Sequence, residues 1–152
     1  MKTVRDILKS KGGEVVTIGP ESTALDALTL MAEKNIGAIM VVDPRGETVG
    51  IFSERDFARK IIVKGRSCEI TPVKDIMTKD VTYAEPDTTI EACMKLMTDG
   101  RFRHLPVKEK GKLAGVISIG DVVKALIQEQ GKIIAEQAFE IGQNERKSTG
   151  VI

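Results

Sequence analysis

The stretch GIFSERDFARKI, residues 50–61, returns in the second half of the chain as GVISIGDVVKAL, residues 115–126. A glycine, a hydroxyl and a carboxylate keep one spacing in both copies, as Gly50, Ser53 and Asp56 and then as Gly115, Ser118 and Asp121. Packing of apolar side chains does not require such a pattern. The repeated polar residues therefore predict a common capping or binding role.

The repeat continues on both sides of this stretch. VRDIL at 4–8 returns as VKDIM at 73–77, and PEST at 20–23 returns as PDTT at 86–89. Self-similarity over this length indicates two homologous units, which divide the chain into a first repeat at 1–63, a linker at 64–72, a second repeat at 73–130 and a helical tail at 131–152. Units of this size bury only about 60% of their unfolded surface, so we expect the halves to pack on each other.

Composition limits the class of protein. The chain has 152 residues, 41% hydrophobic and 30% charged, and its net charge of +1 gives no general attraction to nucleic acid or acidic lipid. The N-terminal segment lacks the apolar core of a signal peptide, and the apolar run at 38–42 is too short to span a bilayer. Cys68 and Cys93 form neither a disulfide framework nor a metal signature. We expect a reduced, cytoplasmic protein with no membrane segment and no bound metal.

Each repeat has the same expected order of elements: an extended stretch, a capped helix, a β-hairpin and a second helix. These are predicted at 15–18, 24–31, 38–52 and 57–62 in the first repeat, and at 81–83, 90–97, 105–117 and 122–127 in the second. Glu91 is expected to complete a capping box with Thr88 at the start of its helix. The pattern predicts an α+β fold built around small sheets.

Together these features resemble a known family, the tandem CBS motifs that pair to form a Bateman module, and in particular stand-alone bacterial CBS-pair proteins. The resemblance covers Val4 to Leu126 and rests on the VxDI[LM] opening, the capped helix, the hairpin and the repeated Gly-x-x-Ser-x-x-Asp. It implies two motifs packed through their sheets about a pseudo-twofold axis, with two related clefts that bind adenosine-containing ligands such as AMP, ATP or NAD(H). It further implies a regulatory module, often a homodimer, that signals to an effector protein through conformational change or assembly.

The Ser-x-x-Asp pattern has two interpretations. It approximates a capping box, with serine at the N-cap and an acid in the first helical turn. Alternatively, the carboxylate accepts hydrogen bonds from a ribose diol, and the helix-start N–H groups bind the adjoining phosphate. The residues alone leave both interpretations open, and the family resemblance favours nucleotide binding.

The resemblance assigns a set of residues to each cleft, and differences in the flanking residues predict that the two clefts are unequal. The Ser-Asp pairs are Ser53 with Asp56 and Ser118 with Asp121, and base contacts are expected near Thr17, Ile18, Thr82 and Tyr83. The flanks differ, because Arg103 and His104 align with Gly37 and Ala38, and Arg55 aligns with Gly120. An arginine such as Arg103 suits bidentate phosphate binding, whereas we expect Arg101 to be a solvated charge.

A catalytic role is not expected. The chain has one histidine, which leaves little for a Ser-His or Cys-His arrangement, and no phosphate-loop, dinucleotide or zinc motif. The alternative to a ligand-binding module is a ligand-independent oligomerisation module, in which the Ser-x-x-Asp residues are only helix caps. Nucleic-acid binding through the cations between 101 and 112 is disfavoured, because the chain has almost no aromatic residues for stacking on bases.

Overall fold

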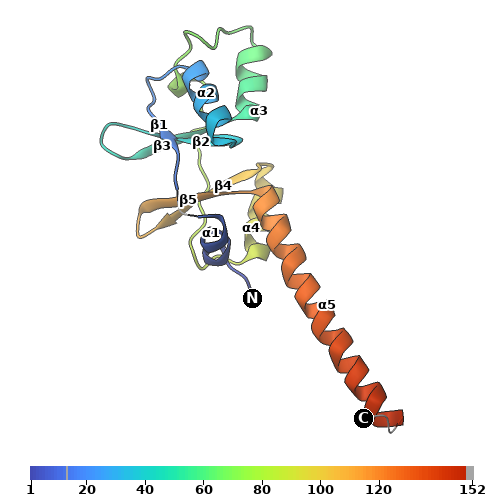
Figure 1. Ribbon diagram of the computed structural model, residues 1–152. Coiled ribbons are helices and arrows are strands. Elements are labelled where there is room, and N and C mark those ends of the chain that lie inside the picture. The colour runs from blue at the N-terminus through green and yellow to red at the C-terminus, as the bar shows by residue number, and fades with distance from the viewer. Residues whose placement is uncertain (13, 150–152) are drawn as a thin grey trace.

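The computed structural model describes residues 1–12 and 14–149, with side chains described up to residue 142. Two small sheets face each other across the middle of the molecule, and helices cover the outer side of each sheet (Figure 1). The tail expected at 131–152 is described up to residue 149, and its last three residues lie outside the described part of the chain.

The first sheet has the order β1-β2-β3, with β1 (Thr17–Ile18) parallel to β2 (Ala38–Val42) and β3 (Thr48–Ser53) antiparallel to β2. Helix α2 (Ala24–Lys34) lies between β1 and β2 in the chain. A helical turn, α3 (Glu54–Asp56), follows β3 and continues as the π-helical segment η1 (Phe57–Ile62). The expected hairpin and both helical segments of this repeat are confirmed.

The second repeat follows the same order with two differences. The elements are the short 3₁₀ turn η2 (Val73–Asp75), helix α4 (Ile90–Gly100), strands β4 (His104–Glu109) and β5 (Lys112–Ser118), and helix α5 (Ile119–Thr149). The extended stretch expected at 81–83 does not form a strand. The next residue, Ala84, makes a single isolated parallel bridge with Val107. The last helix continues without interruption far beyond the repeat.

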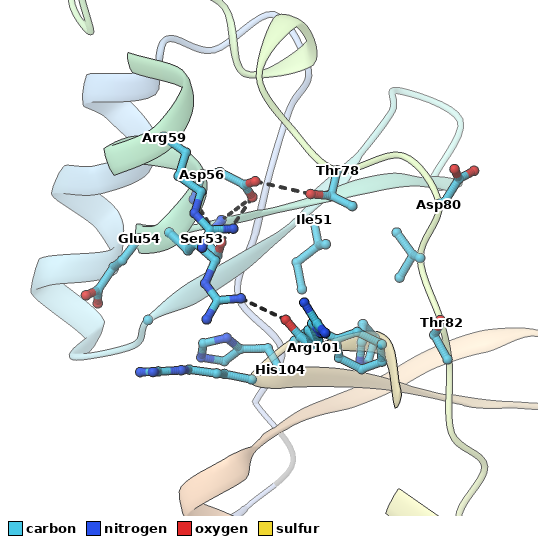
Figure 2. A pocket seen from close by; sticks show the side chains of 17 residues that line it. Ile51, Ser53, Glu54, Asp56, Arg59, Thr78, Asp80, Thr82, Arg101 and His104 are labelled. Carbon is cyan, nitrogen blue, oxygen red and sulfur yellow. Dashed lines mark hydrogen bonds between the residues drawn. The ribbon is translucent and has the colours of Figure 1, made fainter. Parts of the chain in front are cut away.

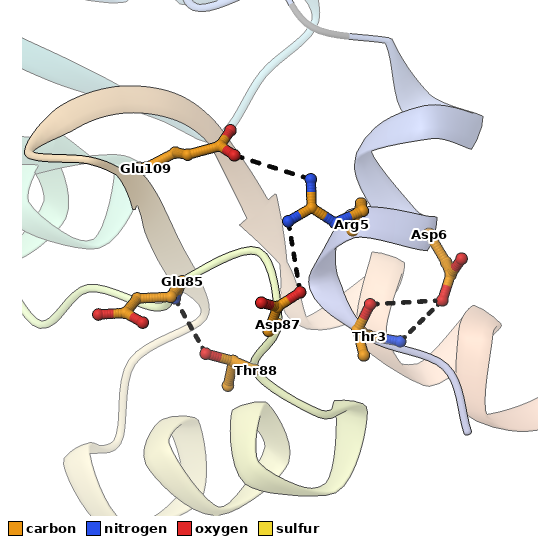
Figure 3. A network of polar contacts seen from close by, with 7 residues as sticks. All are labelled: Thr3, Arg5, Asp6, Glu85, Asp87, Thr88 and Glu109. Carbon is orange, nitrogen blue, oxygen red and sulfur yellow. Dashed lines mark hydrogen bonds and ion pairs between the residues drawn. The ribbon is translucent and has the colours of Figure 1, made fainter.

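The capping box expected between Thr88 and Glu91 is wrong. Helix α4 begins at Ile90 as expected, but its N-cap is Thr89 and not Thr88, and Thr89 accepts a hydrogen bond from the backbone N–H of Ala92 at 3.1 Å. The third helical residue is then an alanine, which has no side chain to return a hydrogen bond. The Thr88 hydroxyl instead accepts from the backbone N–H of Glu85 at 2.9 Å (Figure 3).

The opening segment of each repeat packs on the other repeat. Val4 and Ile7, from helix α1 (Val4–Lys11), are 0% and 6% exposed within the core of the second repeat. Val73 and Ile76 are 0% and 1% exposed within the core of the first. The boundaries between the sequence repeats therefore do not coincide with the boundaries between the two cores.

Polar contacts repeat this exchange in both directions, which gives the molecule its pseudo-twofold symmetry. The backbone N–H groups of Val4 and Val73 donate at 2.9 and 2.8 Å to the corresponding carbonyls of Thr88 and Ser22. Two ion pairs also correspond, Arg5 with Asp87 at 3.3 Å (Figure 3) and Lys74 with Glu21 at 2.8 Å. The two halves are thus tied to each other by their first residues.

Candidate functional site

A cavity of about 730 Å³ lies between the two sheets (Figure 2). Its volume is within the range of small-molecule sites, and we call it the first cleft. Three segments line it: the corner where β3 enters α3, the chain that crosses between the repeats, and the end of α4 with the start of β4. The lining residues are Gly37, Ile51, Ser53, Glu54, Arg55, Asp56, Arg59, Thr78, Asp80, Val81, Thr82, Gly100, Arg101, Phe102, Arg103, His104 and Pro106.

The corner between β3 and α3 is a capping box. The Asp56 backbone N–H donates to Ser53 Oγ at 3.2 Å, and Asp56 Oδ2 accepts from the Ser53 backbone N–H at 3.0 Å. Asp56 Oδ1 accepts from Thr78 Oγ1 at 3.2 Å and lies 3.0 Å from Lys60 Nζ. The capping interpretation is confirmed for this copy, and internal donors already surround the carboxylate.

The segment of the second repeat that crosses from the first core to the second is fixed along the edge of β3. Thr78 exchanges two backbone hydrogen bonds with Ile51, at 3.0 and 2.8 Å. A Cβ on Gly50 would lie 2.6 Å from Met77 Sδ and 2.9 Å from the Thr78 carbonyl. The first residue of the Gly-x-x-Ser-x-x-Asp pattern is therefore a glycine because this segment passes directly over it.

Four arginines line the first cleft. They are Arg55, Arg59, Arg101 and Arg103. Among the described side chains, none of the four lies within ion-pair distance of a carboxylate. Their charge is thus available to an anion that enters the cavity.

Arg101 has an unusual backbone conformation. It ends α4 at a φ of 55°, and its carbonyl accepts a hydrogen bond from the Arg55 guanidinium across the cleft at 2.7 Å. The corresponding C-cap of α2 is Asn35, at a φ of 53°. Asparagine tolerates this left-handed region, whereas arginine in it is strained by about 1 kcal/mol or more. Backbone strain at a cavity wall is a recurrent feature of functional sites.

His104 begins β4 opposite Ser118 and lies between the two repeats. Burial lowers the pKa of its imidazole below the ordinary value, and the nearby Lys11 ammonium lowers it further, against the opposing effects of Glu54 and Asp121. The ring is therefore neutral near pH 7. A Cβ on Gly37 would lie 3.1 Å from His104 Nε2, so this glycine leaves room for the ring.

The corresponding site of the second repeat, formed by Ser118 and Asp121, is occupied by a lysine of the same chain. Lys11 Nζ lies 2.7 Å from Asp121 Oδ2 and donates to the Val116 carbonyl at 2.8 Å. Val116 corresponds to Ile51, so one ammonium group binds the strand carbonyl and the aspartate, the two acceptors that the backbone N–H and the hydroxyl of Thr78 bind in the first cleft. Burial raises the pKa of Asp121, but the hydrogen bonds from Lys11 and Ser118 outweigh it and hold that pKa below the ordinary value.

Residues 3–63 and 73–128 each match the CBS domain family. The chain belongs to the CBS-domain family. It is 44% identical over 136 residues to the mitochondrial CBS domain-containing protein CBSX3 of Arabidopsis thaliana, covering 84% of this chain and 66% of that protein. Among solved structures, a CBS-domain protein of Burkholderia ambifaria assigned to signal transduction is 48% identical, with a TM-score of 0.81 over 85% of this chain and 96% of that one.

One solved structure with this fold is a hexamer. A CBS-CP12 protein from bloom-forming cyanobacteria is hexameric, and it is 28% identical with a TM-score of 0.72 over 80% of this chain and 66% of that one. No helix in the described part of this CBS pair is long and apolar enough to cross a membrane. Its described residues also contain no group of three or more potential ligands positioned to hold a metal ion.

The structure brings together half of the residues expected to bind a ligand. The first cleft of the CBS pair contains Ser53, Arg55, Asp56, Thr82, Arg103 and His104. Ser118, Gly120 and Asp121 lie at the start of α5, where Lys11 contacts Asp121. Thr17 and Ile18 pair with β2 and do not line the first cleft, and Tyr83 lies beneath the Lys108 ammonium, 4.0 Å from its ring centre.

Sequence reasoning missed part of the cleft. Thr78, Asp80 and Arg59 line it, and Arg101, expected to be a solvated charge, is exposed but also forms its wall. The available signal was the repeat itself. The residues after VKDIM are Thr78, Lys79 and Asp80, whereas those after VRDIL are Lys9, Ser10 and Lys11.

Proposed function

We propose that this CBS pair is a regulatory module that binds a phosphorylated adenosine ligand in the first cleft. The observation that carries the proposal is the convergence of four arginines without acidic partners, in the described part of the chain, on a cavity that also contains Asp56. Arginine guanidinium groups bind phosphate oxygens in pairs, and a carboxylate suits a ribose diol. The apolar side chains of Ile51, Val81 and Pro106 offer a surface for the base.

Ribose binding at Asp56 requires an exchange of hydrogen bonds. A carboxylate has about four lone-pair sites, and Ser53, Thr78 and Lys60 already use those of Asp56. An incoming hydroxyl must therefore replace Thr78 Oγ1 or Lys60 Nζ. Thr78 lies on the segment that connects the two cores, so this exchange is the point at which a ligand would act on that segment. Regulation by this route requires that the ligand bind one relative position of the repeats more tightly than another.

The number of arginines favours ligands with more than one phosphate. A single phosphate is satisfied by one or two guanidinium groups, whereas four line this cavity. We therefore expect ATP, ADP or NAD(H) to bind more tightly than AMP, and AMP more tightly than adenosine.

A thermal-shift and calorimetric series with ATP, ADP, NAD(H), AMP and adenosine tests the proposal. A ligand at 100 times its dissociation constant should stabilise the fold by about 2.7 kcal/mol. Lys112→Ala removes a cation at the hairpin turn outside the cleft lining, and it should bind each nucleotide as tightly as the native chain does. Absence of heat and of a thermal shift with every adenine nucleotide at millimolar concentration would contradict the proposal.

A second candidate function is ligand-independent assembly, because the Ser-Asp pairs act as helix caps in both repeats. Asp121 repeats the exchange seen at Asp56, accepting from the Ser118 backbone N–H at 2.8 Å and donating its own N–H to Ser118 Oγ at 3.1 Å. Under this candidate the chain forms a homodimer or binds an effector protein without nucleotide. The thermal-shift series separates the two, since assembly alone predicts no response to any adenine nucleotide.

A further inference from the structure

The Arg55 side chain joins the two cores across the first cleft. Its Nη1 atom, on α3 of the first repeat, donates to the Arg101 carbonyl at the end of α4 at 2.7 Å. The dashed line that reaches Arg101 in Figure 2 marks this bond. Among the described side chains, the other polar contacts between the repeats all involve the opening segments, residues 1–11 and 73–78. In that part of the chain, the Arg55 bond is thus the polar side-chain contact that links the cores themselves.

The backbone at the end of α4 fixes the carbonyl that accepts this bond. Arg101 lies in the left-handed region at a φ of 55°, and its N–H donates to the Met97 carbonyl. The Phe102 ring lies so close to Gly100 that any Cβ at this position would overlap it. A helix hydrogen bond and the packing of an aromatic ring therefore hold the turn on both sides of the carbonyl.

The pseudo-twofold symmetry does not extend to this bond. The symmetric acceptor would be the carbonyl of Asn35, which is the C-cap of α2, and the symmetric donor would be the residue that corresponds to Arg55. That residue is Gly120, which has no side chain to donate. The bond therefore belongs to the first cleft, where the four arginines lie.

A phosphate in the first cleft would compete for the same guanidinium. Arg55 lines the cavity, so its terminal nitrogens are within reach of a ligand there. A phosphate is charged and accepts two parallel N–H bonds from one guanidinium, whereas a carbonyl is neutral. A phosphate that takes the Nη1–Nη2 pair removes the donor from the Arg101 carbonyl. Adenosine has no charged group and offers Arg55 no such acceptor.

We propose that Arg55 is a phosphate-sensitive strap, which fixes the relative position of the two cores in the ligand-free chain and is released by a phosphorylated ligand but not by adenosine. The release rests on the proposed function, because the ligand of the first cleft supplies the phosphate. The buried apolar residues form two clusters that share no member, one in each core. Units without a large common apolar interface move relative to each other by default, so loss of the strap allows a second arrangement.

The distance between spin labels on the two cores, measured by pulsed electron resonance on the full chain, tests the proposal. Glu33→Cys on α2 and Ala92→Cys on α4 place the labels at exposed positions. Cys68→Ser removes a half-buried thiol. Burial raises the pKa of Cys93 to about 11, so this buried thiol stays protonated and unlabelled.

The ligand-free comparison tests the strap itself. The native chain should give one narrow distribution of label distances, and Arg55→Met should add a second population. Arg59→Met is the matched control, because it removes the same charge from the cleft lining but, among the described side chains, no bond to the second core. It should keep the narrow distribution, and circular dichroism checks that both variants are folded. A native distribution in Arg55→Met, or an equal change in both variants, would overturn the strap.

The comparison of ATP with adenosine tests the release. At concentrations that calorimetry shows to be saturating, ATP should produce the second population in the native chain and adenosine should not. Bound ATP that leaves the native distribution unchanged, or adenosine that acts as ATP does, would contradict release by phosphate. Absence of ATP binding in the calorimeter would instead contradict the proposed function, and the ligand-free comparison would still decide whether Arg55 fixes the cores.

Discussion

Asp56 and Asp121 hold corresponding positions in the two repeats, but different groups neutralise them. Asp56 borders a cavity, with Thr78 Oγ1 at 3.2 Å and Lys60 Nζ at 3.0 Å. Asp121 is held by Lys11, whose ammonium lies 2.7 Å away and also binds the strand carbonyl of Val116. The difference indicates that the Ser-x-x-Asp pattern alone does not make a ligand site. The segment that arrives from the other repeat decides whether the carboxylate faces a ligand or a lysine.

The largest expected effect on ATP affinity is the difference between neutralising Asp56 and neutralising Asp121. Asp56→Asn should weaken ATP binding by about 10- to 100-fold, because a hydrogen bond to a charged group contributes about 1.5–3 kcal/mol. Asp121→Asn removes the corresponding carboxylate and should leave affinity unchanged. Calorimetric titration of both variants measures the contrast. An equal loss in the two variants would show that both aspartates bind the ligand.

Exchanging the two C-caps should separate stability from affinity. Arg101→Asn gives α4 the cap of α2, so it should raise the free energy of unfolding by about 1 kcal/mol through relief of left-handed strain. It should also weaken ATP binding roughly fivefold, the equivalent of about 1 kcal/mol for one partly solvated ionic contact. Asn35→Arg should lower stability with no effect on affinity. A variant at position 101 that loses stability would contradict the strain argument.

A smaller effect is expected from acid. The folded pKa of His104 lies below its unfolded value of about 6.5, so the unfolded state takes up the proton first. Stability should therefore fall as pH drops through about 6.5, and the loss should be complete below the folded pKa. Urea unfolding at about pH 7.5 and about pH 5 should show this loss in the native chain and a smaller one in His104→Gln. Asp121 does not contribute in this window, because its lowered pKa acts only in stronger acid.

The sequence was sufficient to predict elements that depend on local patterns. Both hairpins, the capped corner at Ser53 and the repeat of helices follow from apolar spacing and turn residues, which act over a few positions. The exchange of Val4 and Val73 between the two cores was not predicted, because it joins segments about half a chain apart. The match of VRDIL to VKDIM ends just before the residues that differ. The repeat therefore did not predict that Lys11 contacts Asp121. Arg101 was misjudged because a helix C-cap, and not its charge, turns it toward the cleft.

The number of ATP molecules bound per chain, measured by calorimetry at known active concentration, tests the central claim most directly. The native chain should bind one, at the first cleft, while Lys11 occupies the second site. Lys11→Met, which keeps the length of the side chain but removes its ammonium, should expose Asp121 and allow a second, weaker molecule to bind. Two equivalent sites on the native chain, or binding that Lys11→Met abolishes, would contradict the account.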